Sequence, residues 1–196
     1  MEMKEEALDR QLHEILDPLG VELHGPDGPN EGLLEARLRE ARQSGPFIEV
    51  VCLYAEEDER YWKQLFEHFT VLRDDHLSWH PCKVSKQWKM PVEELMHQLE
   101  RAHLVLTLIS VDLLVALIRL DPCIEETLAR IARFEVRAFA SFIVVLSACA
   151  WEDYQFAQLS EVLPKNARPL TLWRRREAAY VEVVQAVRAA IESVSS

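Results

Sequence analysis

The chain has 196 residues, a length that fits one domain with a small appendage. Hydrophobic residues make up 49% of it, enough to bury a sizeable core, and only 5 glycines and 9 prolines exclude a low-complexity or fibrous chain. The formal net charge of −11 argues against a general nucleic-acid-binding protein, because the long-range field repels phosphates. Residues 174–176 form the only run of three arginines, which we interpret as the solvated start of a helix, with a binding role as the alternative.

The cysteines and the apolar stretches indicate the cellular compartment in which the protein is expected. Cysteines at positions 52, 82, 123 and 149 form no CxxC pair and do not resemble a disulfide framework. Residues 1–10 are charged and lack the apolar centre of a signal peptide. The longest uncharged apolar stretch, residues 138–151, is too short to span a membrane. We therefore expect a cytoplasmic protein without a membrane partner.

Residues 1–46 predict a helical extension. The first helix carries an apolar face, with spacings of three and four residues, at Leu8, Leu12, Ile15, Leu16 and Leu19. Breaker residues at 25–30 separate it from a second helix with apolar residues Leu34, Leu38 and Ala41. Two short helices cannot form a core of their own, so we expect them to pack on the main domain or on a partner.

From residue 47 the pattern changes to alternating strands and helices. Residues 47–54 predict a buried strand, the acids at 56–58 suit a helix start, and the following stripe of large apolar residues up to Leu72 predicts a helix. A short strand at 76–79 and a loop at 80–87 precede a helix around Val92 to Leu99.

The second half of the chain continues the alternation. Residues 104–110 predict the clearest strand, 111–120 a helix, and Asp121-Pro122 the start of another. Further strands are expected at 141–147 and 169–173, before a closing amphipathic helix at 178–194. This order predicts a mostly parallel sheet covered by helices on both faces. Its core should bury Leu106, Leu108, Val144 and Leu146.

Six short segments, in their order and spacing, resemble Toll/interleukin-1 receptor-like (TIR-like) domains of bacterial signalling and defence proteins. The segments are VCLYAEED (51–58), AHL with DLL (102–104, 112–114), PCIEE (122–126), WED (151–153), LPK (163–165) and PLTLW (169–173). The resemblance covers residues 47 to 194 and identifies residues 47–196 as a TIR-like domain. It implies a flavodoxin-like sheet of five parallel strands, which together with the alternation predicts the order 2-1-3-4-5 with helices on both faces.

The resemblance also implies a function in signal transduction or immunity, including antiphage defence. Such a module assembles with TIR-like or other signalling proteins, or with copies of itself. Two departures matter: Leu53 stands where the family has a serine, and the loop at 80–87 lacks the acids and glycine that the family has beside its nucleotide pocket.

Glu126 is the candidate catalytic residue. In the family, the matching glutamate is required where NAD is cleaved, and a carboxylate can stabilise the oxocarbenium-like state of that reaction. The alternative is structural, because Glu125 and Glu126 lie near a helix start, where acids interact favourably with the helix dipole. No cofactor is predicted; NAD enters only as a substrate.

Tyr54, Trp79 and Ser110 are the candidate ligand-binding residues. Tyr54 and Ser110 end two strands, at the edge where ligands bind in open parallel sheets, and Trp79 should line the same crevice. The alternatives are core aromatic residues, and a helix cap for Ser110. His76, His80 and Cys82 lack a fourth ligand at a standard spacing, so no metal site is predicted.

Two hypotheses follow from these residues. The first is a non-catalytic module that acts by protein–protein assembly, which Leu53 and the altered loop favour. The second is an NAD glycohydrolase that uses Glu126.

Overall fold

The computed structural model describes residues 31–43, 47–72, 77–85, 92–120 and 122–195. The helix predicted over residues 8–19 lies outside this part of the chain, as does His76.

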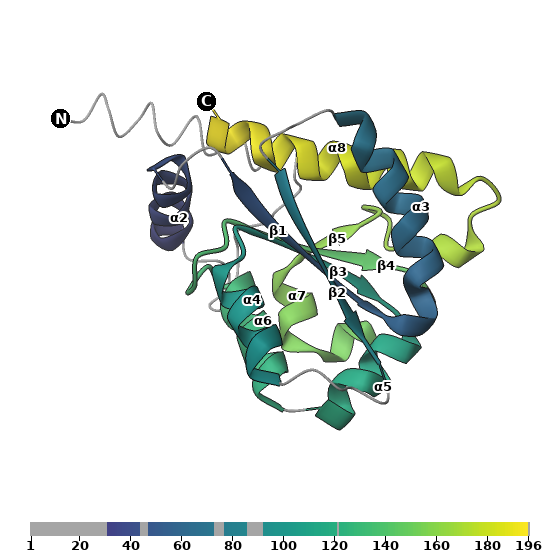
Figure 1. Ribbon diagram of the computed structural model, residues 1–196. Coiled ribbons are helices and arrows are strands. Elements are labelled where there is room, and N and C mark those ends of the chain that lie inside the picture. Colours follow the sequence, from purple (N-terminus) through teal and green to yellow (C-terminus); the bar gives the residue numbers. More distant parts are fainter. Residues whose placement is uncertain (1–30, 44–46, 73–76, 86–91, 121, 196) are drawn as a thin grey trace.

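A parallel sheet of five strands forms the centre of the fold (Figure 1). All neighbouring strands run parallel, in the order β2-β1-β3-β4-β5, so the predicted α/β fold and strand order are confirmed. The strands are β1 (Ile48–Ala55), β2 (Leu77–Val84), β3 (Leu104–Ile109), β4 (Ala140–Val145) and β5 (Glu161–Leu163).

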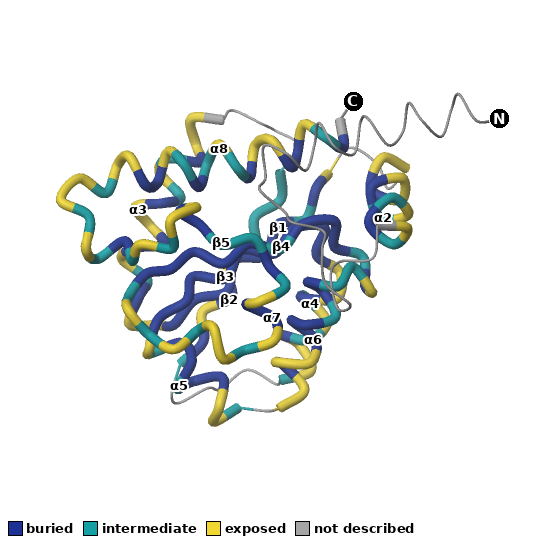
Figure 2. Tube along the Cα trace, turned by 180° about the vertical axis from the view of Figure 1, so that it is seen from behind, coloured by how far each residue is buried: buried dark blue, intermediate teal, exposed yellow. Residues whose placement is uncertain are grey.

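Helices cover both faces of this sheet, as expected (Figures 1 and 2). One face carries α2 (Glu31–Gln43), α3 (Glu59–Phe69) and α8 (Arg176–Ser195). The other face carries α4 (Val92–Arg101), α5 (Val111–Leu120), α6 (Pro122–Ala132) and α7 (Gln155–Leu159). Single 3-10 turns lie at Glu56–Asp58, Thr70–Leu72, Trp151–Asp153 and Leu170–Leu172.

The buried strands divide the core into two halves, because successive side chains of a strand point to opposite faces of the sheet. In β1, Val50, Cys52 and Tyr54 belong to the half beneath α3 and α8, whereas Val51 and Leu53 belong to the half beneath α4 to α7. The four predicted core residues are buried, none of them more than 1% exposed: Leu106, Leu108, Val144 and Leu146.

Two predicted strands differ from the observed ones. β2 does not end at Trp79 but pairs with β1 up to Val84, so most of the expected loop at 80–87 is strand. Pro81 is compatible with this position because β2 is an edge strand of the described sheet. The fifth strand is residues 161–163 rather than 169–173; the latter segment contains a 3-10 turn in which Thr171 N–H bonds the Leu146 carbonyl at 3.0 Å.

The second predicted helix, α2, packs on the main domain. Its apolar residues Leu34, Leu38 and Ala41 are buried, and α2 contacts α8. Two arginines tie it to distant backbone: Arg37 Nε donates to the Phe134 carbonyl at 3.2 Å, and Arg42 Nη2 to that of Ser193 at 2.8 Å. Of the two placements expected for the extension, α2 therefore adopts the intramolecular one.

Candidate functional site

The carboxyl ends of β1 and β3 flank the point where the chain changes its direction along the sheet. From β1 the chain passes to β2 on one side and then to β3 on the other. Ligands of open parallel sheets bind in the crevice at such a switch point. Two polar side chains meet here, Asp58 three residues beyond β1 and Ser110 directly after β3, and both are buried.

Ser110 holds two partners at once. Its hydroxyl donates to Oδ2 of Asp58 and accepts the backbone N–H of Leu113 at 3.1 Å. The second bond makes Ser110 the N-cap of α5, so the capping interpretation of Ser110 is confirmed. Because the single donor hydrogen of the hydroxyl goes to Asp58, a ligand that accepts a hydrogen bond from Ser110 would have to displace that contact.

Asp58 is the buried acid of this edge. Burial raises the pKa of its carboxyl; the bond from Ser110 opposes that rise, and the carboxylates of Asp112 and Glu57 add to it. The sequence indicated Asp58 as one of three acids at a helix start and as the last residue of the VCLYAEED segment, without a role of its own. Its position just past a buried strand, at a switch point, is the signal that marks it as a site residue.

Tyr54 and Trp79 belong to an aromatic cluster beneath α3 rather than to a crevice. Trp62 connects them, with ring centroids 5.8 Å from Tyr54 and 5.9 Å from Trp79, and Phe69 packs 4.5 Å from Trp79. Tyr54 is 4% exposed, and burial raises its pKa to about 12. Trp79 is the third residue of β2 and does not lie at the carboxyl end of the strand, which corrects the expected position. This environment favours the core-aromatic alternative for both.

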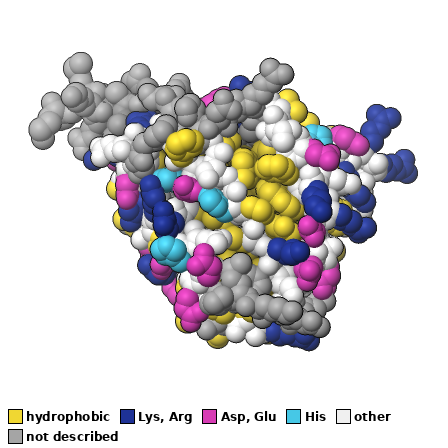
Figure 3. All heavy atoms as spheres, in the orientation of Figure 1, with side chains coloured by type: hydrophobic (Ala, Val, Ile, Leu, Met, Phe, Trp, Pro, Cys, Tyr) yellow, Lys and Arg dark blue, Asp and Glu magenta, His cyan; other side chains and the backbone are white. Residues whose placement is uncertain are grey.

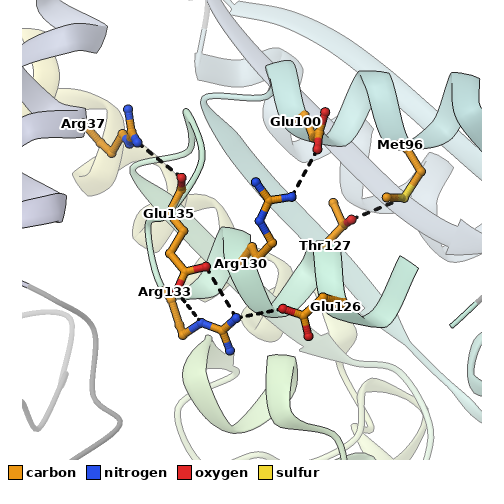
Figure 4. A network of polar contacts seen from close by, with 8 residues as sticks. All are labelled: Arg37, Met96, Glu100, Glu126, Thr127, Arg130, Arg133 and Glu135. Carbon is orange, nitrogen blue, oxygen red and sulfur yellow. Dashed lines mark hydrogen bonds and ion pairs between the residues drawn. The ribbon is translucent and has the colours of Figure 1, made fainter. Parts of the chain in front are cut away.

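Glu126 lies on α6, on the other side of the sheet. Its side chain is 62% exposed and bonds Arg133 at 3.0 Å, and Arg133 also bonds Glu135 at 2.8 Å (Figure 4). Arg37 of α2 donates to the Glu135 carbonyl, so this ion-pair network links α6 to the extension. The structure therefore does not bring Glu126 together with Tyr54 and Trp79, and the expected common crevice is not formed by these residues.

Two cavities are lined by residues other than the four predicted site residues. One, of about 290 Å³, lies between α4 and the β1–β2 edge and is lined by Glu49, His80, His97 and Arg101, among others. Figure 3 shows histidine and charged side chains gathered beside a hydrophobic patch on this side of the molecule. A second cavity, of about 490 Å³, lies between α3 and the start of α8 and includes Arg174. The four predicted site residues are not among the described residues that line either cavity.

At the β1–β2 edge, the described polar side chains around His80 are not arranged as a catalytic relay. Ser78 Oγ lies 3.0 Å from Nε2 of His80, and the Glu49 carboxylate contacts the same nitrogen. A nucleophile–histidine–acid triad needs the two partners on opposite ring nitrogens. Within the described part of the chain, no group of three His, Cys, Asp or Glu residues is arranged to hold a metal ion.

Comparisons with models of known protein families and with curated proteins found no match. The resemblance to TIR-like domains therefore remains a prediction from the residues. Among the described helices, none combines the length and the apolar composition that crossing a membrane requires.

Proposed function

We propose that this protein is a TIR-like signalling or defence module that acts by protein–protein assembly. The observation that carries the proposal is the separation of the residues that an NAD-cleaving site would use. Glu126 lies on a helix of one sheet face, whereas Tyr54 and Trp79 pack in the core of the other face. One crevice cannot draw on all three side chains without rearrangement of the core.

Two further features support assembly over catalysis. Leu53, which replaces the serine of the family, is fully buried beneath α4 to α7, so it offers no polar group at the sheet edge. Residues 80–84 belong to β2, so most of the segment expected to flank a nucleotide pocket is strand.

The second candidate function is an NAD glycohydrolase. The exposure of the Glu126 side chain favours it, because an accessible carboxylate can approach a bound ligand and stabilise an oxocarbenium-like state. In that case the Arg133 ion pair would have to open, or the carboxylate would act while still paired.

The two functions are separated by measuring NAD consumption and particle size on the same samples. The full chain, Glu126→Gln and the neighbouring exposed control Glu125→Gln are incubated with NAD over a range of protein concentrations, with and without a crowding agent. We expect assembly without NAD consumption. NAD consumption by the wild-type chain would overturn the proposal. If it fell by orders of magnitude in Glu126→Gln alone, the enzyme hypothesis would replace it.

A further inference from the structure

Helix α5 has an apolar face on the outside of the molecule as well as on the inside. Its inner face, Leu113, Leu114, Ala116 and Leu117, is buried against the sheet and its neighbouring helices. On its outer face Val111 is 51% exposed, Ile118 is 70% exposed and Val115 is partly exposed. The spacing of four and three residues places these three side chains in one stripe along the helix. A helix that covers a core in water ordinarily presents polar residues there.

The stripe is flanked by two opposite charges. Asp112, in the first turn, and the exposed Arg119, in the last, are seven residues apart, so they lie on the same side of the stripe about two turns from each other. The point midway between them lies between residues 115 and 116, one residue beyond the middle of the stripe. Each charge is about 5 Å along the axis from this midpoint, in opposite directions.

This arrangement is self-complementary. If two copies of α5 pack antiparallel about a twofold axis through the midpoint between Asp112 and Arg119, residues on the same flank face each other. Asp112 of each copy then lies opposite Arg119 of the other, and Val115 meets its own symmetry mate. In a parallel twofold pair, the same flank of the two helices lies on opposite sides of the contact, so Asp112 of one copy does not face Arg119 of the other.

Helix α5 lies at the periphery of the described structure. Both views show it at one extreme of the molecule, beyond α4 and α6 (Figures 1 and 2). Its start is fixed by Ser110 and by the Val111 N–H, which lies 3.4 Å from Ser147 Oγ. A helix held at its start and packed on its inner side presents the outer stripe in a defined orientation.

We propose that the occupant of this face is a second copy of the chain, which docks α5 against α5 in an antiparallel, twofold-symmetric pair. The proposal rests on the assembly function proposed above and names the surface and the partner. The stripe contributes the apolar centre of the contact, and the Asp112–Arg119 pairs, present twice, set its direction.

Sedimentation of the full chain over a concentration series tests the apolar part. We expect dimerisation that Ile118→Glu weakens by about tenfold or more, because the twofold axis repeats the buried charge. The matched control is Val71→Glu, which places the same charge at a residue that is 76% exposed in the turn after α3. A monomeric wild-type chain, or equal dimerisation of both variants, would overturn the proposal.

Charge swaps test the antiparallel direction. Asp112→Arg and Arg119→Asp should each dimerise less than the wild type, since each variant places like charges opposite each other. An equimolar mixture should dimerise again, because every introduced charge then faces its opposite. Circular dichroism confirms that each variant is folded. A mixture no better than its components would refute the pairing. If Ile118→Glu still assembles like the wild type, the α5 contact is refuted but the proposed assembly function is not. NAD consumption by the wild-type chain would instead overturn the proposed function.

Discussion

The hydroxyl of Ser110 bonds the buried carboxyl of Asp58, 52 positions earlier in the chain, and thereby joins the ends of β1 and β3 at the switch point of the sheet. The same oxygen caps α5. One side chain therefore links the position of α5 to the strand edge where ligands of open parallel sheets bind.

Ser110→Ala should lower the free energy of unfolding by about 1–3 kcal/mol, because it leaves a buried carboxyl without its donor and removes a helix cap. Denaturant unfolding measures the loss. Ser147→Ala is the control at the same helix start, since the Ser147 hydroxyl accepts a long bond of 3.4 Å from the Val111 N–H, and we expect a loss of less than about 0.5 kcal/mol. Equal losses would show that the Asp58 contact contributes nothing.

Leu106→Ala should cost about 2–5 kcal/mol, because Leu106 is fully buried in β3, the central strand, and its truncation leaves a cavity. The thermal midpoint and denaturant unfolding both report this loss. Leu172→Ala provides the comparison, since Leu172 is largely exposed and should change stability by less than about 0.5 kcal/mol. An unchanged midpoint for Leu106→Ala would contradict its place in the core.

The sheet could be predicted because its long strands are apolar runs separated by helical stripes. β2 was predicted too short because Pro81 and Lys83 interrupt its pattern, although a proline is tolerated on an edge strand. β5 has only three residues and begins with Glu161, so it carries no pattern of its own. The segment 169–173 is apolar because Leu170 packs in the core from a 3-10 turn.

The candidate site could be predicted from the sequence less well than the sheet. The Asp58–Ser110 contact joins residues distant in sequence, which one sequence without homologues does not reveal. The predicted position of Tyr54 near the end of β1 is confirmed, but its stacking on Trp62 of α3 is a contact between two elements that the sequence pattern does not reveal. The orientation of the Glu126 side chain depends on Arg133, which lies seven residues later, just after the end of α6, and donates a hydrogen bond to it.

Removing residues 1–46 should destabilise the domain, because this deletion exposes the surface on which Leu34, Leu38 and Ala41 are buried. Removing residues 1–30 keeps α2 and is the matched comparison. We expect the longer deletion to lose more stability in thermal unfolding, by roughly 2 kcal/mol or more, since several apolar side chains are uncovered. Equal midpoints for the two deletions would show that α2 adds nothing to the fold.

Glu161, the first residue of β5, should make stability depend on pH. Its Oε1 atom is buried and has no hydrogen-bond partner within the part of the chain that the structure describes. Burial raises the pKa of this carboxyl to about 7, against the opposing effect of Lys165. Between pH values of about 4.3 and 7, the folded protein therefore keeps a proton on Glu161 that the unfolded chain, in which this pKa is about 4.3, has released. The contribution of Glu161 to stability is present below that lower value and is lost as the pH rises through about 7.

Glu161→Gln should therefore be more stable than the wild type at pH 8, by about 1–3 kcal/mol, and close to it at pH 4, because the amide avoids burying a charge. Denaturant unfolding at the two pH values measures the difference. Glu192→Gln is the control: Glu192 is exposed and pairs with Arg188 one turn away on α8, so its removal should cost about 0.5 kcal/mol or less. The contradicting result is an equal change in the free energy of unfolding of Glu161→Gln and the wild type between pH 4 and pH 8. Ionisation of Glu161 would then cost the folded protein nothing, so its carboxylate would be in contact with water. In that case β5 would be more open to water than its pairing with β4 indicates.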